Sequence, residues 1–193
     1  MTGINAIIFY SGSLFEESFQ AKGTAIIDVA NFLSTLVGVG LLYYAGRKTL
    51  MAVLQVFVIV SMFGMWYFTA EDDNQTIRLV MTVAFICAFE FGPGPIVWLY
   101  ISEICNDKAT SVGTVMNWFW TLIVSILAPF LIEDWLADGK TWLMFSGISF
   151  IGLIFIVTMM KETMGKSEYE VKNLYVKNGN ISGVVQTRNM KIV

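Results

Sequence analysis

The amino-acid sequence predicts an all-helical integral membrane protein with six membrane segments, the first of them incomplete, followed by a polar tail. Two observations predict this fold class. Hydrophobic residues make up 56% of the 193 residues and charged residues 14%, whereas a soluble domain has roughly 45–50% and about 25%. The apolar residues also gather in blocks of about 20 residues, the length that a helix needs to cross a bilayer. A soluble globular enzyme does not fit this composition.

Five apolar blocks are long enough to span a membrane, and the first block has about half of that length. Short polar breaks separate the blocks, so consecutive helices are expected to run antiparallel as neighbours. In chain order, the blocks cover about residues 4–14, 24–44, 50–70, 77–104, 111–132 and 142–160. The polar residues that end the blocks include Glu16 and Glu17, Arg47 and Lys48, Glu71 to Asp73, Glu133 and Asp134, and Lys161 and Glu162.

The composition changes after Gly165. Residues 166–193 are polar and carry clusters of Asn and Gly, which indicates a segment outside the membrane. A short helix is expected near residues 168–175. The sequence therefore predicts two parts, a membrane-spanning bundle over residues 1–165 and a polar tail over residues 166–193.

The charges at the helix ends predict which end of the bundle faces the cytoplasm. The ends alternate between two faces, one with five Lys and Arg residues and the other with three. Loops rich in Lys and Arg stay in the cytoplasm, so the loops that contain Arg47 and Lys108 are expected there, together with the tail. We expect a multi-pass protein of the plasma membrane, with an organelle membrane as the alternative.

The sequence contains no catalytic or metal-binding constellation. Histidine is absent, so no His-based triad or His metal site can form within this chain. Cys87 and Cys105 lie in or beside apolar runs and are interpreted as packing residues. The net charge is −3, and the scattered Lys and Arg residues argue against nucleic-acid binding. We expect no catalytic residue, no metal and no cofactor.

The fourth block contains the residues that are most costly in lipid. Glu90 lies deep inside it, and a carboxylate near the middle of a membrane is a candidate functional residue. The stretch 92–95 (Gly-Pro-Gly-Pro) follows, and such a broken helix is tolerated only around a cavity or inside protein. Trp98 lies one turn further on. Acid, broken helix and aromatic ring together favour a substrate site at the membrane midplane; the alternative is a structural kink, with Glu90 bonded to a neighbouring helix.

Three Asn residues lie inside membrane segments on three different helices: Asn5, Asn31 and Asn117. A single Asn in a membrane is more often a link between helices than a ligand. Three of them near an acid could instead converge on a polyhydroxylated solute, on which Trp98 or Trp118 can stack. Asp28 could couple protons or lie near the outer end of its helix, where acids cost little; we favour the outer end.

Several stretches resemble motifs of the sugar porter family of the major facilitator superfamily, in matching order and spacing across residues 2–165. They resemble its seventh helix, its Gly-Arg-Arg loop between helices eight and nine, its tenth helix, an Asn-Trp pair in helix eleven and the Pro-Glu-Thr-Lys-Gly box after helix twelve. The matched stretches are, in that order, residues 2–11 (TGINAIIFYS), 45–50 (AGRKTL), 89–98 (FEFGPGPIVW), 117–118 (NW) and 161–165 (KETMG).

The resemblance implies hexose transport by alternating access, either facilitated or proton-coupled, with this chain as the C-terminal six-helix half. The positions that line the central sugar site in the family match Asn5, Asn31, Glu90 and Trp98 here, and Trp118 is expected close to that site. The implied partners are a small-molecule sugar, the lipid bilayer, and an N-terminal six-helix half or other membrane subunits.

The resemblance also implies residues that open and close the transporter. Phe9 and Tyr10 match an aromatic pair that helps to close the outer gate, and the broken helix is assigned to gating through Gly92, Pro93, Gly94 and Pro95. Ion pairs between helix ends can stabilise one of two packings. The residues that match the cytoplasmic charge network of the family are Gly46, Arg47, Glu103 and Glu162.

The sequence departs from the family pattern at several positions. It matches only the second half of a family member, and the upstream half of its first helix, with a Gln-Gln pair that contacts sugar, is not matched. Tyr43 and Tyr44 stand where an acidic–basic pair is usual, and Val97 and Lys161 replace prolines. Two main hypotheses follow: a sugar transporter represented by its C-terminal half, or a non-transporting structural subunit of a larger membrane complex that derives from a transporter. A sugar sensor is a third option.

Overall fold

The computed structural model describes residues 2–10, 15, 17–70, 74–132 and 139–175. Every regular element in these ranges is a helix, which confirms the all-helical prediction. The helices are α1 (Ile4–Tyr10), α2 (Glu17–Leu41), α3 (Arg47–Ala70), α4 (Gln75–Phe91), α5 (Pro93–Ile104), α6 (Asp107–Phe130), α7 (Lys140–Met159) and α8 (Glu168–Asn173).

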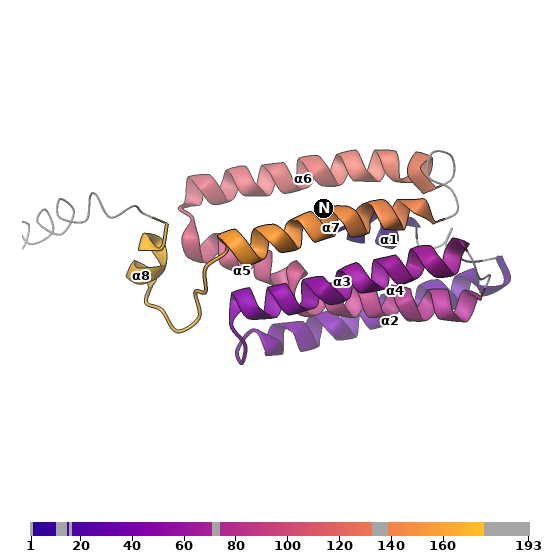
Figure 1. Cartoon of the computed structure of the whole chain (residues 1–193), viewed down its shortest axis with the longest axis horizontal. Helices are drawn as coiled ribbons and strands as arrows, with labels where there is room; N and C mark the ends of the chain where they lie inside the picture. Colours follow the sequence, from indigo (N-terminus) through magenta and orange to yellow (C-terminus); the bar gives the residue numbers. More distant parts are fainter. Residues whose placement is uncertain (1, 11–14, 16, 71–73, 133–138, 176–193) are drawn as a thin grey trace, which may run out of the picture.

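Five segments of the described chain are long and apolar enough to cross a membrane, and α4 and α5 together form one of them. Helix α1, in the first and shorter apolar block, has 7 residues. The long helices run side by side, and α8 lies at the end of the bundle where α3 and α6 begin (Figure 1). The five full spans predicted from the apolar blocks are therefore confirmed, and the partial first span stays a prediction.

The helices begin earlier than the apolar blocks because polar residues extend and cap them. Helix α2 begins at Glu17, whereas the apolar block begins near residue 24. The first N–H groups of a helix lack partners within it. The Asn74 side chain accepts hydrogen bonds from the first turn of α4, and the Asn106 side chain accepts one from Ala109 in α6 at 2.9 Å.

Helix α3 is the centre of the bundle. It packs against α7, α4 and α5, while α2 packs against α4, and α1 against α6. Polar groups also join α3 to α7: the Gln55 amide donates to the carbonyl of Ser149 at 3.1 Å, and the Ser146 hydroxyl donates to that of Ile59 at 3.3 Å. Such bonds hold membrane helices together where no hydrophobic effect does. The buried apolar core includes Ala6, Ile7, Val58, Met62, Met65, Phe85, Ile86, Trp142 and Phe145.

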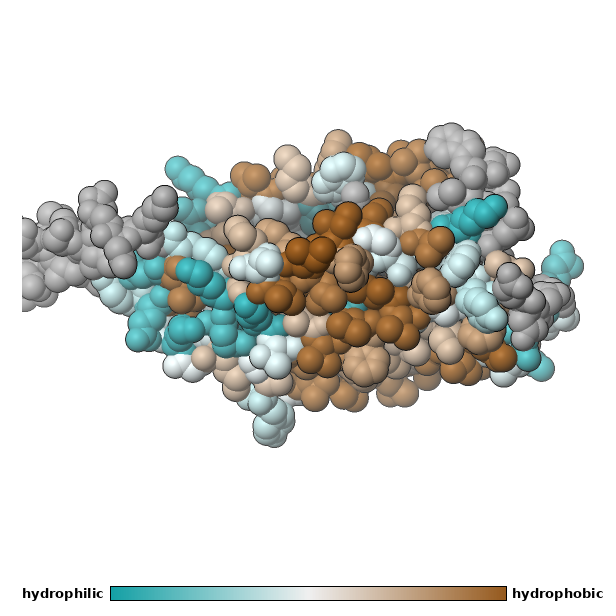
Figure 2. All heavy atoms as spheres, viewed as in Figure 1, coloured by the Kyte–Doolittle hydropathy of each residue, from teal (hydrophilic) through white to brown (hydrophobic). Residues whose placement is uncertain are grey.

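Two helices leave long apolar faces uncovered. Helix α6 contacts α1 and α5, and only Ala128 of its residues is buried. Apolar side chains cover the middle of the bundle surface and hydrophilic ones gather toward its ends (Figure 2). Exposed apolar faces of this extent require lipid or further protein to cover them. The large exposed apolar residues of α2 and α6 include Val29, Phe32, Leu33, Leu36, Val112, Val115, Phe119, Leu122 and Ile126.

Helices α2 and α4 lie close together at Gly38. A Cβ atom on Gly38 would overlap the carbonyl oxygen of Glu90 and lie 3.3 Å from the Cα of Phe91. The atoms that such a Cβ would meet all belong to the backbone of α4. Unlike a side chain, this backbone cannot rotate away to remove the overlap. Small residues permit such close approaches between membrane helices.

We expect Gly38→Ala to separate α2 from α4 and to lower the thermal midpoint of the detergent-solubilised protein, because overpacking costs about 1–3 kcal/mol. Gly40→Ala is the matched control, since a Cβ atom there has no neighbour within 4 Å. Size-exclusion chromatography after heating measures both variants. Equal midpoints for the two variants would show that this contact does not determine stability.

Candidate functional site

A cavity of about 370 Å³ lies between α1, α3, α5, α6 and α7. Most of its wall is apolar, with a few polar groups and two indole rings set into it. This is the composition typical of small-molecule sites, whose polar groups fix the orientation of a ligand. The polar and aromatic lining residues are Thr2, Asn5, Gln55, Phe89, Trp98, Asn117, Trp120, Thr121 and Phe155.

Two of the expected sugar-site residues, Asn5 and Trp98, line this cavity together with Asn117. Asn5 is held in place by a bond from its amide nitrogen to the Thr121 hydroxyl at 3.2 Å, which joins α1 to α6. Trp98 comes from α5 and is 43% exposed, so its ring is accessible to a ligand. The structure thus brings together residues from three helices that are far apart in the sequence.

Helix geometry decides which residues of α6 reach the cavity. Asn117, Trp120, Thr121 and Val124 all line it, and residues three or four positions apart share one face of a helix. Trp118 follows Asn117 directly, so it points about 100° away around the helix; it is 63% exposed and does not line the cavity. Our sequence analysis missed Trp120 and Thr121, although their spacing from Asn117 could have identified them.

Gln55 is a third lining residue that the sequence analysis did not single out. It lies in the middle of α3 and is 3% exposed, and its bond to Ser149 uses one of the hydrogen-bonding positions of the amide. A polar side chain inside a membrane segment is a functional candidate by default. This rule, applied to Gln55 as it was to Glu90, is the signal that could have found it.

The other two expected sugar-site residues on α2 and α4, Asn31 and Glu90, lie outside the lining of the cavity. The Thr35 hydroxyl joins them, because it lies 2.9 Å from the carbonyl oxygen of Asn31 and 3.0 Å from a carboxylate oxygen of Glu90. The Oδ1 atom of Asn31 is buried and has no hydrogen-bond partner among the described residues. Phe89 faces the cavity, whereas its neighbour Glu90 faces α2.

The stretch of the fourth span that was expected to break does so at Gly92. Gly92 leaves the helical conformation, with φ −137° and ψ −88°, and α5 begins at Pro93, a position where the missing N–H of proline has no cost. A Cβ atom on Gly92 would lie 2.7 Å from Leu54 of α3, so the break is packed against the centre of the bundle. Pro93 and Gly94 line the cavity, which makes the junction of α4 and α5 part of its wall.

The expected outer-gate pair lies at the end of α1. Phe9 is 57% exposed, and the side chain of Tyr10 lies outside the described part of the structure. Pro95 is in the first turn of α5.

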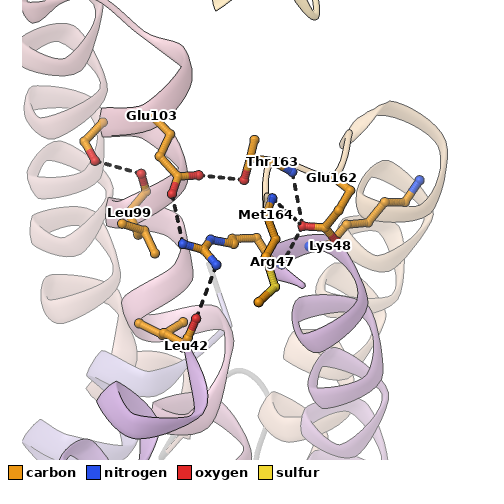
Figure 3. A network of polar contacts seen from close by, with 9 residues as sticks. Leu42, Arg47, Lys48, Leu99, Glu103, Glu162, Thr163 and Met164 are labelled. Carbon is orange, nitrogen blue, oxygen red and sulfur yellow. Dashed lines mark hydrogen bonds and ion pairs between the residues drawn. The ribbon is translucent and has the colours of Figure 1, made fainter. Parts of the chain in front are cut away.

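At the end of the bundle near α8, the residues expected to form a charge network meet (Figure 3). An Nη2 atom of Arg47 lies 3.2 Å from the Glu103 carboxylate, and its Nη1 donates to the carbonyl of Leu42 at 3.2 Å. The other Glu103 oxygen accepts a bond from the Thr163 hydroxyl at 2.6 Å. The network therefore joins the end of α2, the start of α3, the end of α5 and the segment after α7.

Glu162 caps the start of α3 from the far end of the chain. Its two carboxylate oxygens accept the backbone N–H groups of Arg47 at 2.8 Å and Lys48 at 3.1 Å, where the helix dipole favours a negative charge. A Cβ atom on Gly46 would overlap this carboxylate, so glycine at this position makes room for it.

The same contacts set the charge of Glu162. Burial by itself raises the pKa of the Glu162 carboxyl, but the amides of Met164, Arg47, Thr163 and Thr49 together favour the charged form more strongly. Its pKa therefore lies below its ordinary value of 4.5.

Comparison with known proteins identifies the family of the chain. The family model described as sugar (and other) transporter matches residues 1–175. The facilitated trehalose transporter Tret1-1 of Drosophila sechellia is 32% identical over 205 residues, which cover 98% of this chain and 24% of that protein. The facilitated trehalose transporter Tret1 of Drosophila pseudoobscura pseudoobscura is 33% identical over 206 residues, which cover 99% of this chain and 23% of that protein. The chain thus spans about a quarter of the length of these relatives.

Solved structures show the same fold. The proton:xylose symporter XylE bound to 6-bromo-6-deoxy-D-glucose gives a TM-score of 0.81 at 22% identity, covering 90% of this chain and 40% of that one. The inward open conformation of XylE from E. coli gives 0.74 at 19% identity, covering 90% and 41%. Fold and sequence therefore agree, and the chain belongs to the family of sugar (and other) transporters.

Proposed function

We propose that this chain supplies the C-terminal six-helix half of a sugar transporter that works by alternating access. The observation that carries the proposal is the meeting of Asn5, Asn117, Thr121 and Trp98 at one cavity inside membrane-spanning helices. The relatives named as trehalose transporters and the xylose symporter with the same fold support a sugar as the substrate. The family of transporters also agrees with the expectation that the chain is not an enzyme.

The lining of the cavity suits a sugar. Amides and a hydroxyl can donate to and accept from sugar hydroxyls, and the indole rings of Trp98 and Trp120 can pack against the apolar face of a sugar ring. The volume of about 370 Å³ lies within the roughly 300–1,000 Å³ of ligand pockets. We propose a hexose unit as the group that is bound.

A second half is expected to complete the site. Asn31, Glu90 and Trp118 carry polar or aromatic groups that stand beside the cavity rather than in it, and Glu90 is too costly to leave against lipid. An N-terminal six-helix half that covers this face would enclose these groups beside the sugar. Transporters of this type place the substrate between two such halves.

Gating is proposed at both ends of the bundle. The network of Gly46, Arg47, Glu103 and Glu162 ties α5 to α3 and to the segment after α7, and we assign it to the cytoplasmic end on the charge bias of the loops. The junction from Gly92 to Pro95 is the hinge that lets α5 move relative to α4, and Phe9 and Tyr10 belong to the opposite gate. We propose the plasma membrane as the location. No feature of the described residues favours a structural subunit instead.

Uptake of radiolabelled glucose and trehalose into vesicles tests the proposal. We expect no uptake with the chain alone and uptake when it is co-expressed with a six-helix N-terminal half from the same genome. Absence of uptake from membranes in which the two halves are inserted and assembled would contradict sugar transport.

Trp120→Ala and Trp118→Ala form a matched pair on α6 that tests the position of the site. We expect Trp120→Ala to lower sugar uptake at least tenfold, because its ring lines the cavity, and Trp118→Ala to have a smaller effect. Concentration dependence of uptake gives KM and the maximal rate for each variant. A larger loss from Trp118→Ala would place the sugar on the outer face of α6 instead.

Glu162→Gln is expected to destabilise the end of the bundle by about 1 kcal/mol, the usual cost of losing a helix cap, and to change the rate of uptake without changing KM. Glu168→Gln is the control, because its side chain is 81% exposed on α8. Thermal unfolding in detergent compares the two variants with the native chain.

The pH dependence gives a further check on Glu162. A carboxyl with a lowered pKa stabilises the folded state above its unfolded pKa, and the contribution disappears as pH falls through the folded value. The stability difference between the native chain and Glu162→Gln is therefore expected to be constant near neutral pH and to shrink below pH 4.5. A difference that grew on acidification would contradict a charged cap.

A further inference from the structure

Tyr175, which lies shortly after α8, contacts the end of α5 through a pair of tyrosines. Tyr100 lies in the last turns of α5 and Tyr175 lies just after α8, and their hydroxyl oxygens are 2.6 Å apart. The Tyr175 hydroxyl oxygen also lies 3.0 Å from the carbonyl oxygen of Met159, the last residue of α7. Residues 75 positions apart in the sequence therefore meet where α5, α7 and the tail come together.

Lys161 joins both tyrosines through its backbone and its side chain. Its N–H reaches the hydroxyl oxygens of Tyr100 at 3.1 Å and Tyr175 at 3.0 Å, and its carbonyl accepts from Tyr100 at 2.9 Å. Its ammonium donates to the carbonyl of Leu174 at 2.6 Å and lies 5.0 Å from the centre of the Tyr175 ring, a distance at which a cation is attracted to an aromatic face. We refer to Tyr100, Lys161 and Tyr175 as the tyrosine clamp.

The tyrosine clamp depends on a residue at which this sequence departs from the pattern it resembles. Lys161 stands at the position of the proline in the Pro-Glu-Thr-Lys-Gly box. Proline has neither a backbone N–H nor a side-chain donor, so a proline at this position could donate to neither tyrosine hydroxyl and would keep only the carbonyl that accepts from Tyr100. The substitution therefore adds contacts at the end of the bundle.

The clamp acts on the helix that the hinge leaves most free to move. Helix α5 is separated from α4 by the break at Gly92, and it ends at Ile104. Its far end is held at two points one turn apart, Glu103 through Arg47 and Thr163, and Tyr100 through Lys161 and Tyr175. A hinged helix with its free end tied to the tail is a two-state element that the tail can bias.

We propose that the tyrosine clamp is a second lock on α5, by which the segment Glu168–Tyr175 holds the inner gate closed. Its role in transport rests on the proposed function, whereas its role in holding α5 does not. Tyr175 is 46% exposed, so a factor that displaces the segment Glu168–Tyr175 can release the lock without entering the bundle.

Reactivity of Cys105 tests the lock. Cys105 directly follows α5 and is half-buried, and Cys87 is the only other cysteine of the chain. In a Cys87→Ala background, co-expressed with a cysteine-free N-terminal half, we expect Tyr100→Phe and Tyr175→Phe each to raise the rate of maleimide labelling at Cys105 about fivefold, the change that follows from losing one hydrogen bond. Lys161→Pro is expected to give at least the same increase.

Tyr169→Phe is the matched control, because Tyr169 lies on α8 and is 58% exposed away from the clamp; its labelling rate is expected to equal that of the native chain. Native rates in both clamp variants would overturn the proposal. The same substitutions in a Cys105→Ala background report on Cys87 in α4, whose thiol accepts a bond from Ser34. A rise in Cys87 labelling would mean general unfolding and would also overturn the lock.

The labelling and uptake experiments separate the two proposals. Increased labelling in membranes that take up no sugar would support the lock and contradict the transporter function. Normal sugar uptake together with native labelling rates in the clamp variants would support the transporter function and contradict the lock.

Discussion

The cost of leaving a polar group without a partner in hydrocarbon governs this structure. It restricts the spanning segments to helices, in which the backbone groups bond to one another. Backbone groups without a partner in their own helix then occur only at the helix ends and at the break in the fourth span. The break is covered by packing rather than by hydrogen bonds alone, since Gly92 lies against Leu54 in α3. Polar side chains within the spans, such as Gln55, Asn5 and Glu90, bond to other helices or line the cavity, so their positions mark the surfaces at which helices or a ligand meet.

The helix ends near α8 show how local capping becomes long-range structure. In a soluble protein a helix is usually capped by a neighbour in sequence, as Asn74 caps α4 here. The start of α3 is capped instead by the Glu162 carboxylate. At the end of α2, the Arg47 guanidinium donates to the carbonyl of Leu42. Because each cap comes from another element, satisfying the backbone also fixes the positions of four segments relative to one another.

Composition and block length predicted the spans well, because both depend only on the thickness of the bilayer. Their ends were less predictable, since caps such as Asn106 extend a helix beyond its apolar block. The meeting of Asn5 and Trp98 followed from resemblance and not from spacing, because only tertiary packing places α1 beside α5 and α6. The angular position of a residue around its helix decides whether it lines the cavity. Trp120 and Phe89 do, whereas their near neighbours Trp118 and Glu90 do not. No local sequence pattern predicts the pairing of Tyr100 with Tyr175, because tertiary structure alone brings these residues, 75 positions apart, together.

The cap on α3 also has a consequence for the order in which the molecule is made. Arg47 and Glu162 are 115 positions apart, so the start of α3 remains without its anion until α7 has been synthesised and inserted. Helices α2 to α6 can enter the bilayer one after another, yet the end that unites them closes only when the last span delivers its carboxylate. A nascent chain that ends before residue 162 therefore has its spans but leaves the N–H groups of Arg47 and Lys48 at the start of α3 without this partner.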